Sequence, residues 1–152
     1  MAFDIFAGAN VTVEVGTYTA GSTTPATDFE IIPELGAFPT MGAESVVIDV
    51  VTFNSAYNRK LLGTKSVPDI PLTVNYLPDN AVHTKLLALA EDQKRAQFKI
   101  TYYTDGTHDE GYYAIYNAFI SSSTTGGDKD AVVVREFVLS VDGGPLATGL
   151  VE

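Results

Sequence analysis

The stretch from Gln97 to Ile120, QFKITYYTDGTHDEGYYAIYNAFI, decides the fold class of this sequence. Its first six residues alternate polar and apolar side chains, which is the period of a β-strand with one buried face. The second half, Tyr112–Ile120, reads as an aromatic-rich strand, and Asp105-Gly106 between the two is a turn signal. The stretch therefore predicts an antiparallel hairpin.

Further strands are predicted on either side of this hairpin, from alternation or from runs of β-branched residues. They span Asn10–Val15, Ser45–Phe53, Val67–Tyr76 and Ala131–Asp142. Both faces of Ser45–Phe53 are apolar, so we expect this strand to be covered on both sides. Pro68 and Pro71 restrict the start of the next strand to a sheet edge or a bulge. The Gly-, Ser- and Thr-rich segments Tyr18–Asp28 and Ser121–Asp130 are predicted to be loops.

One helix is predicted after Pro78, over residues 79–95. Asp79 is the expected N-cap, and Lys94 and Arg95 suit the negative end of the helix dipole. An apolar stripe runs along it through Val82, Leu86, Leu89 and Ala90. With six or seven strands, no internal repeat and 152 residues, the chain is predicted to be a single domain, 1–152. Within it we expect an N-terminal strand and flexible arm (1–29), an extended loop (54–70) and a C-terminal tail (143–152).

Composition excludes several classes of protein. The chain has 19 acidic and 9 basic residues, a formal net charge of −10, so general attraction to nucleic-acid phosphates is excluded. It contains no cysteine, which excludes disulfides and thiolate metal sites. No apolar run approaches the length of a membrane span, so we expect a soluble protein made in a cytoplasm. Charged residues form only 18% of the chain, which indicates that part of its surface contacts protein.

Groups that could perform catalysis are scarce, since the chain has two histidines and no cysteine. His83 is predicted to lie partly exposed on the helix. His108, Asp109 and Glu110 could hold a divalent metal, but their spacing matches no calcium loop and no zinc site, so a solvated hairpin tip is expected. We therefore predict no enzymatic activity, no catalytic residues, no cofactor and no metal.

Tyrosines and a phenylalanine cluster in the hairpin and allow two interpretations. They are Tyr102, Tyr103, Tyr112, Tyr113, Tyr116 and Phe119. Cross-strand aromatic pairs inside a sheet are one explanation, and a stacking platform for sugars is the other. The second leaves a carbohydrate-binding or virion decoration module as an alternative. A hydrolase whose dispersed carboxylates meet only in the fold is a further alternative.

Three of the nine basic residues lie close together in Asn54–Ser66, a segment predicted to be an exposed excursion. They are Arg59, Lys60 and Lys65, with Gly63 among them. The segment is either a solvated surface or a docking loop that pairs with acids on another copy of this acidic chain.

The order of short motifs between residues 30 and 146 resembles that of siphophage major tail tube proteins, whose fold is shared with the tubes of contractile tails and of type VI secretion. The motifs are Ile32-Pro33-Glu34-Leu35-Gly36, Val51-Thr52-Phe53-Asn54-Ser55, Val74-Asn75-Tyr76, Pro78-Asp79-Asn80 before the helix, Phe98-Lys99-Ile100, and Phe137 to Pro145. The resemblance implies two packed antiparallel sheets, sandwich-like or barrel-like, flanked by a helix. It also implies a structural subunit of the virion tail.

The resemblance further implies that subunits join into hexameric rings, and that these rings stack into a conduit through which DNA passes without specific binding. It assigns ring stacking to the excursion, with Asn54, Arg59, Lys60, Gly63 and Lys65 as its site residues. Tail tip or initiator, tape measure and terminator proteins are the implied partners. An anionic lumen would repel DNA, and Glu136 and Asp142, which share one strand face with Ser140, are the candidate lumen acids.

Overall fold

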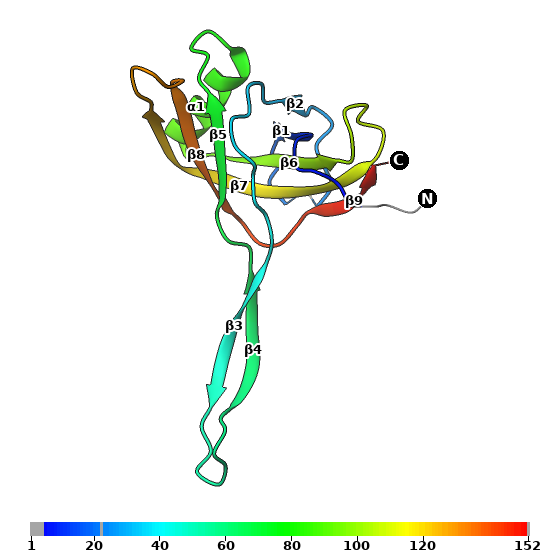
Figure 1. Ribbon diagram of the computed structural model, residues 1–152, viewed down its shortest axis with the longest axis vertical. Coiled ribbons are helices and arrows are strands. Elements are labelled where there is room, and N and C mark those ends of the chain that lie inside the picture. The colour runs from blue at the N-terminus through cyan, green and yellow to red at the C-terminus, as the bar shows by residue number, and fades with distance from the viewer. Residues whose placement is uncertain (1–4, 22, 152) are drawn as a thin grey trace.

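The computed structural model describes residues 5–21 and 23–151 of the chain. Residues 1–4 and 22 of the expected N-terminal segment, and residue 152 of the expected tail, lie outside the described residues. The described chain forms one helix and nine strands in two antiparallel sheets, which confirms a mainly β fold with one helix (Figure 1). The strands are β1 Val11–Thr17, β2 Glu30–Ile31, β3 Glu44–Val50, β4 Arg59–Ser66, β5 Ile70–Asn75, β6 Arg95–Tyr103, β7 Gly111–Gly126, β8 Val134–Val141 and β9 Ala147–Val151, and the helix is α1 Ala81–Asp92.

The larger sheet closes on itself and forms a barrel. Its strands follow the order β2-β1-β6-β7-β8-β5, so β2 and β5 would be its two edges. The chain that continues from β2 reaches the free edge of β5, where Gly36 N donates to Thr73 O (2.8 Å) and Asn75 N donates to Glu34 O (2.7 Å). Residues 30–36 thus pair with β1 at their start and with β5 at their end. Closure removes the edges that an open sheet would expose.

Alternating side chains from the long strands of the larger sheet fill the barrel. Those with almost no exposure include Val13 and Val15 of β1, Leu72 and Val74 of β5, Phe98 and Ile100 of β6, and Phe137 and Leu139 of β8. The predicted alternation in β1 and β6 is therefore confirmed. The proline-containing β5 has a proper ladder with β8 alone, as expected for an edge strand.

The last third of the chain is more regular than its composition suggests. Ser121–Asp130 was expected to be a loop, but β7 continues to Gly126, with a bulge between Ile120 and Ser122. The second half of β7 pairs with β8, and its first half pairs with β9. The expectation of a loop is therefore wrong for residues 121–126, and the segment expected to be the C-terminal tail contains β9. Serine and threonine tolerate strand geometry well when a partner strand satisfies their backbone groups.

The helix α1 covers the barrel beside residues 30–33, and it is shorter than predicted. Its N-cap is Asn80, not Asp79: the Asn80 side-chain oxygen accepts hydrogen bonds from the backbone N–H groups of Val82 (2.9 Å) and His83 (3.2 Å). The helix ends at Asp92, and Gln93 follows in the left-handed conformation. Arg95 belongs to β6, so the predicted basic last turn is wrong.

In its described residues, 18–21 and 23–28, the segment Tyr18–Asp28 is a loop as predicted, and the barrel wall holds it in place. The buried Gln97 side chain accepts a hydrogen bond from Ala26 N (2.7 Å) and donates one to Thr24 O (3.3 Å). Phe29, just beyond it, lies so close to Gly16 that a Cβ there would come within 2.9 Å of its ring. The absence of a side chain at Gly16 lets the loop return across β1.

The second sheet is a two-stranded hairpin, β3 paired with β4, which projects from the body (Figure 1). Two predictions need correction here. The strand at Ser45–Phe53 was expected to be covered on both faces, but both faces of β3 are exposed. Residues 59–66, expected to be loop, are a strand, although their predicted exposure is confirmed. The two sheets are therefore not packed face to face.

Candidate assembly surfaces

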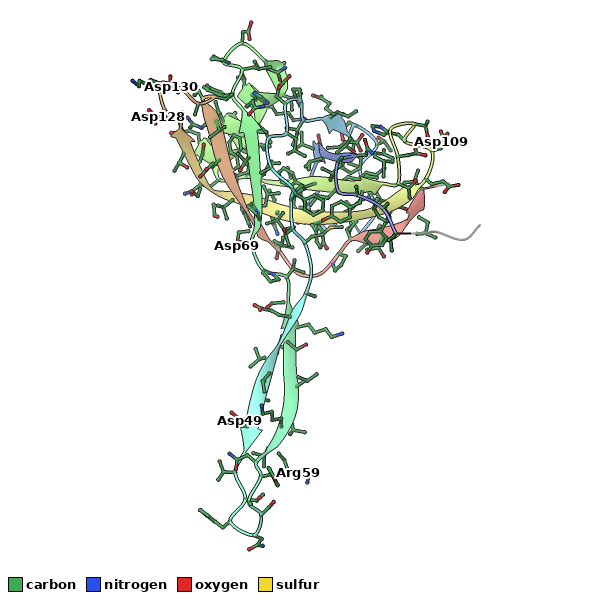
Figure 2. All side chains as sticks on the ribbon, in the orientation of Figure 1. Asp49, Arg59, Asp69, Asp109, Asp128 and Asp130 are labelled. Atoms are coloured by element: carbon green, nitrogen blue, oxygen red, sulfur yellow. The ribbon has the colours of Figure 1, made fainter. Side chains whose placement is uncertain are left out.

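We call residues 44–66, the projecting hairpin of β3 and β4, the arm. This name does not refer to the N-terminal segment 1–29. Its strands join in register from Glu44 opposite Ser66 to Val50 opposite Arg59, with one irregularity after Ser45. The arm's tip is formed by residues 51–58, and its base lies beside Asp69 (Figure 2). A two-stranded ribbon has no interior of its own, so its side chains meet either solvent or another molecule.

Large apolar side chains cover both faces of the arm. Those exposed by about half or more are Val46, Val47, Ile48, Val51, Phe53, Tyr57, Leu61 and Leu62. Phe53, at the tip, is 100% exposed. A contiguous apolar surface of this kind marks an interaction site, because a free monomer gains nothing by keeping it in water.

The arm is the basic part of an acidic molecule. It carries three bases, Arg59, Lys60 and Lys65, and two acids, Glu44 and Asp49, so its net charge is +1. Because the whole chain has a net charge of −10, the rest of the chain carries −11. Elsewhere in the described residues, ion pairs join Lys85 to Glu30 (3.8 Å), Arg95 to Asp142 (2.6 Å) and Lys99 to Glu14 (4.0 Å). No ion pair within residues 5–21 and 23–151 involves the three bases of the arm.

The five residues predicted for the excursion all lie on the arm, but they are not one cluster. Asn54 is at the exposed tip, and Arg59 and Lys60 follow where β4 begins. Lys60 lies opposite Asp49 across the ladder, and Lys65 lies opposite Ser45 near the base. At Gly63 a Cβ would meet the side chain of Ile48 at 3.4 Å, an ordinary van der Waals contact, so the packing of the arm does not require a glycine there.

The two acids predicted to face the lumen of an assembled tube, Glu136 and Asp142, lie on the outer face of the subunit's own barrel, away from its filled core. Glu136 alternates with the buried Phe137 and is exposed, on the face that it shares with Ser140. Asp142 follows β8 and accepts a hydrogen bond from Arg95, whose guanidinium lies over the Tyr18 ring at 4.4 Å. The charge of Asp142 is thus compensated, whereas that of Glu136 is not within the described chain.

The aromatic residues of the hairpin do not form a common platform. Tyr102 and Tyr112 are direct cross-strand partners, while Tyr113 and Phe119 point to the opposite face. The Tyr102 hydroxyl donates to Pro39 O (2.7 Å), its ring stacks on Phe38, and burial raises the pKa of Tyr102 to about 12. This arrangement favours the interpretation of aromatic pairs within the sheet over that of a sugar-binding surface.

His83 is buried, not partly exposed as predicted. Its Nδ1 accepts a hydrogen bond from Leu77 N (3.2 Å), which leaves Nε2–H to donate to Pro33 O (3.0 Å). The side chain joins α1 to residues 30–36, the segment that closes the barrel, so its role is structural. The sequence could have predicted this burial, because His83 lies one helical turn before Leu86 and therefore on the same, buried face of α1.

The other histidine, His108, stacks on Tyr103 at 4.2 Å in the exposed loop between β6 and β7. In residues 5–21 and 23–151, no three His, Asp or Glu side chains are placed to hold a metal ion. The only helix of that part of the chain is too short and too polar to cross a membrane.

The sequence-based prediction did not include the apolar side chains of the arm among the site residues and relied on its basic residues. The signal was present: two apolar runs, SVVIDVV and KLLG, flank a polar turn containing Asn54 and Ser55. A hairpin with both faces apolar predicts contact with other chains.

Solved structures show which fold this is, namely that of phage tail tube subunits. A chain of the SPP1 tail tube matches with a TM-score of 0.66 and 14% identity, over 96% of this chain and 78% of that one. A chain of the native gene transfer agent virion matches with a TM-score of 0.67 and 16% identity, over 97% and 100%. A chain from the tail of the empty gene transfer agent particle gives 0.66 and 17%, over 93% and 97%. No curated protein sequence matches.

The sequence itself identifies the family. Residues 6–148 match the family model described as phage tail tube protein. The chain therefore belongs to the phage tail tube protein family and is a structural subunit of a phage tail tube. The resemblance found in the sequence is confirmed, and with it the assignment to the virion tail and to self-association.

Proposed function

We propose that the protein assembles into hexameric rings that stack into a hollow tube, and that the arm connects one ring to the next. The observation that carries this proposal is the arm: an apolar, basic hairpin that projects from a closed, acidic barrel. A subunit with an attached element of this kind forms heterologous contacts, which produce an open stack when repeated along an axis. The six-fold ring number is supported by the C6 symmetry of the similar gene transfer agent tail.

The tube would be the conduit for DNA, with Glu136 and Asp142 on the lumen side as a further part of the proposal. The outer barrel face carries Glu14, Glu136 and Asp142 against Lys99 and Arg95, so it is weakly acidic. A surface of this charge would not retain the DNA backbone. Tail tip or initiator, tape measure and terminator proteins are the proposed partners at the ends and inside of the tube, and we propose no enzymatic activity.

Electron microscopy of the purified protein at high concentration, with and without initiator components, tests the proposal. Hollow tubes or stacked rings are expected. The variant Arg59→Glu with Lys60→Glu should form shorter tubes or single rings. Small monodisperse particles of the unmodified protein under every condition would contradict tube formation, and unchanged tube length in the variant would contradict the stacking role of the arm.

A further inference from the structure

The chemistry of the arm defines the surface that can receive it. Arg59 and Lys60 need acidic partners, and the valines and leucines beside them need an apolar surface. A second arm is a poor partner, because both would bring the same basic residues to the contact. If copies stack along one direction, as proposed above, the end of the molecule opposite the arm is the end that faces the arm of the neighbouring copy.

The end of the body away from the arm carries such a surface. In Figure 2 Asp128 and Asp130 lie at the opposite end of the long axis from Asp49 and Arg59. Next to these acids, the β7–β8 connection exposes Val132 by 62% and Val133 by 51%. This connection contains one base, Lys129.

The turn before α1 completes this surface. Tyr76 N donates to Val133 O (3.0 Å), so residues 77–79 lie beside the β7–β8 connection. They contribute the exposed Leu77 and Asp79. We call Leu77, Asp79, Asp128, Asp130, Val132 and Val133 the distal rim. With Lys129, which lies between two of its three acids, this surface has a net charge of −2. Its charge is therefore opposite to that of the arm, and like the arm it exposes apolar side chains.

The distal rim is also held in shape. Asp128 accepts hydrogen bonds on its side chain from Lys129 N (2.7 Å) and on its backbone oxygen from Ala131 N (3.1 Å). Arg135 underneath donates to Ser123 (2.9 Å) and lies 5.8 Å from the centre of the Tyr76 ring. A preformed acceptor loses less conformational entropy on binding than a flexible one.

We propose that the distal rim of one copy is the docking surface for the arm of the next copy. Leu77, Val132 and Val133 receive the apolar side chains of the arm, and Asp128 and Asp130 face Arg59 and Lys60. The groove between α1 and β7 is a less suitable acceptor, since Glu91 and Arg135 both line it and oppose each other in charge. This inference rests on the proposed stacking and adds its receiving surface.

A charge-swap experiment tests the pairing through the critical concentration for assembly, measured by pelleting and negative-stain microscopy. Four variants are compared with the unmodified protein. They are the arm variant R59E/K60E, the rim variant D128K/D130K, the variant that combines all four changes, and E91K/D92K, which matches the rim variant in charge but lies at the far end of α1. Circular dichroism checks that each is folded.

The arm variant and the rim variant are each expected to raise the critical concentration about tenfold, and the combined variant to return it to within about twofold. E91K/D92K should assemble normally. Normal assembly of the rim variant, failure of the combined variant to recover, or impaired assembly of E91K/D92K alone would overturn the docking surface while leaving tube formation intact. Absence of tubes from the unmodified protein would overturn both proposals.

Discussion

Replacing Leu61 and Leu62 by serine separates assembly from folding. The two side chains are 56% and 73% exposed in the subunit, on opposite faces of the arm. The double change should therefore alter the free energy of unfolding by less than about 0.5 kcal/mol per site. If the arm is buried between stacked copies, each leucine loses about 1–2 kcal/mol of interface burial, which together raises the critical concentration roughly a hundredfold.

Leu72 supplies the matched control for this experiment. It is the same residue type on a strand, but it is 1% exposed inside the barrel. Leu72→Ala should cost about 2–5 kcal/mol of unfolding free energy. Urea unfolding of dilute subunits and pelleting of concentrated ones measure the two quantities separately. The reasoning is refuted if the arm variant polymerises at the normal concentration, or if it unfolds as easily as Leu72→Ala.

Three further changes probe the elements that support these surfaces. Asn80→Ala should lower the unfolding free energy by about 1 kcal/mol in urea titration, whereas Asp79→Ala should change it by less than half of that, because Asn80 caps α1. Gln97→Leu should leave Ala26 N without its partner, cost about 1–3 kcal/mol and speed proteolysis within residues 18–28; an unchanged cleavage rate would contradict the anchoring role. The raised pKa of Tyr102 means that the unfolded chain ionises first as pH rises, so stability falls between about pH 10 and pH 12. Tyr102→Phe should flatten this fall in thermal melts, and an equally steep fall in both proteins would contradict it.

Strands with one buried face were predictable from the sequence. In β1 and β6 the side chains that fill the barrel alternate with others, so the pattern along the chain records the position of the core. The end of β7 and the whole of β9 do not show this alternation of buried and other side chains. Their backbones are satisfied by β8 and by the start of β7, and the partner strand, not local composition, makes them strands.

The arm shows a second limit of sequence patterns. Its apolar run SVVIDVV was correctly predicted as a strand, but covered faces were inferred from apolarity alone. Apolar composition indicates that a surface is to be buried, and it does not say by which molecule. His83 illustrates the opposite error, since a polar residue on the apolar stripe was assigned to the surface although two backbone groups satisfy its ring.

The position of the arm in the chain makes it a replaceable module. It lies between residue 36 and β5, two segments that the hydrogen bonds of Gly36 and Asn75 hold side by side. Whatever hairpin joins them, the barrel ladder is the same, and doubling the length of such an insert costs only about 0.6 kcal/mol of closure entropy. Arms of different length or specificity can therefore be exchanged on one barrel, so the reach and the choice of neighbour can change without redesign of the fold.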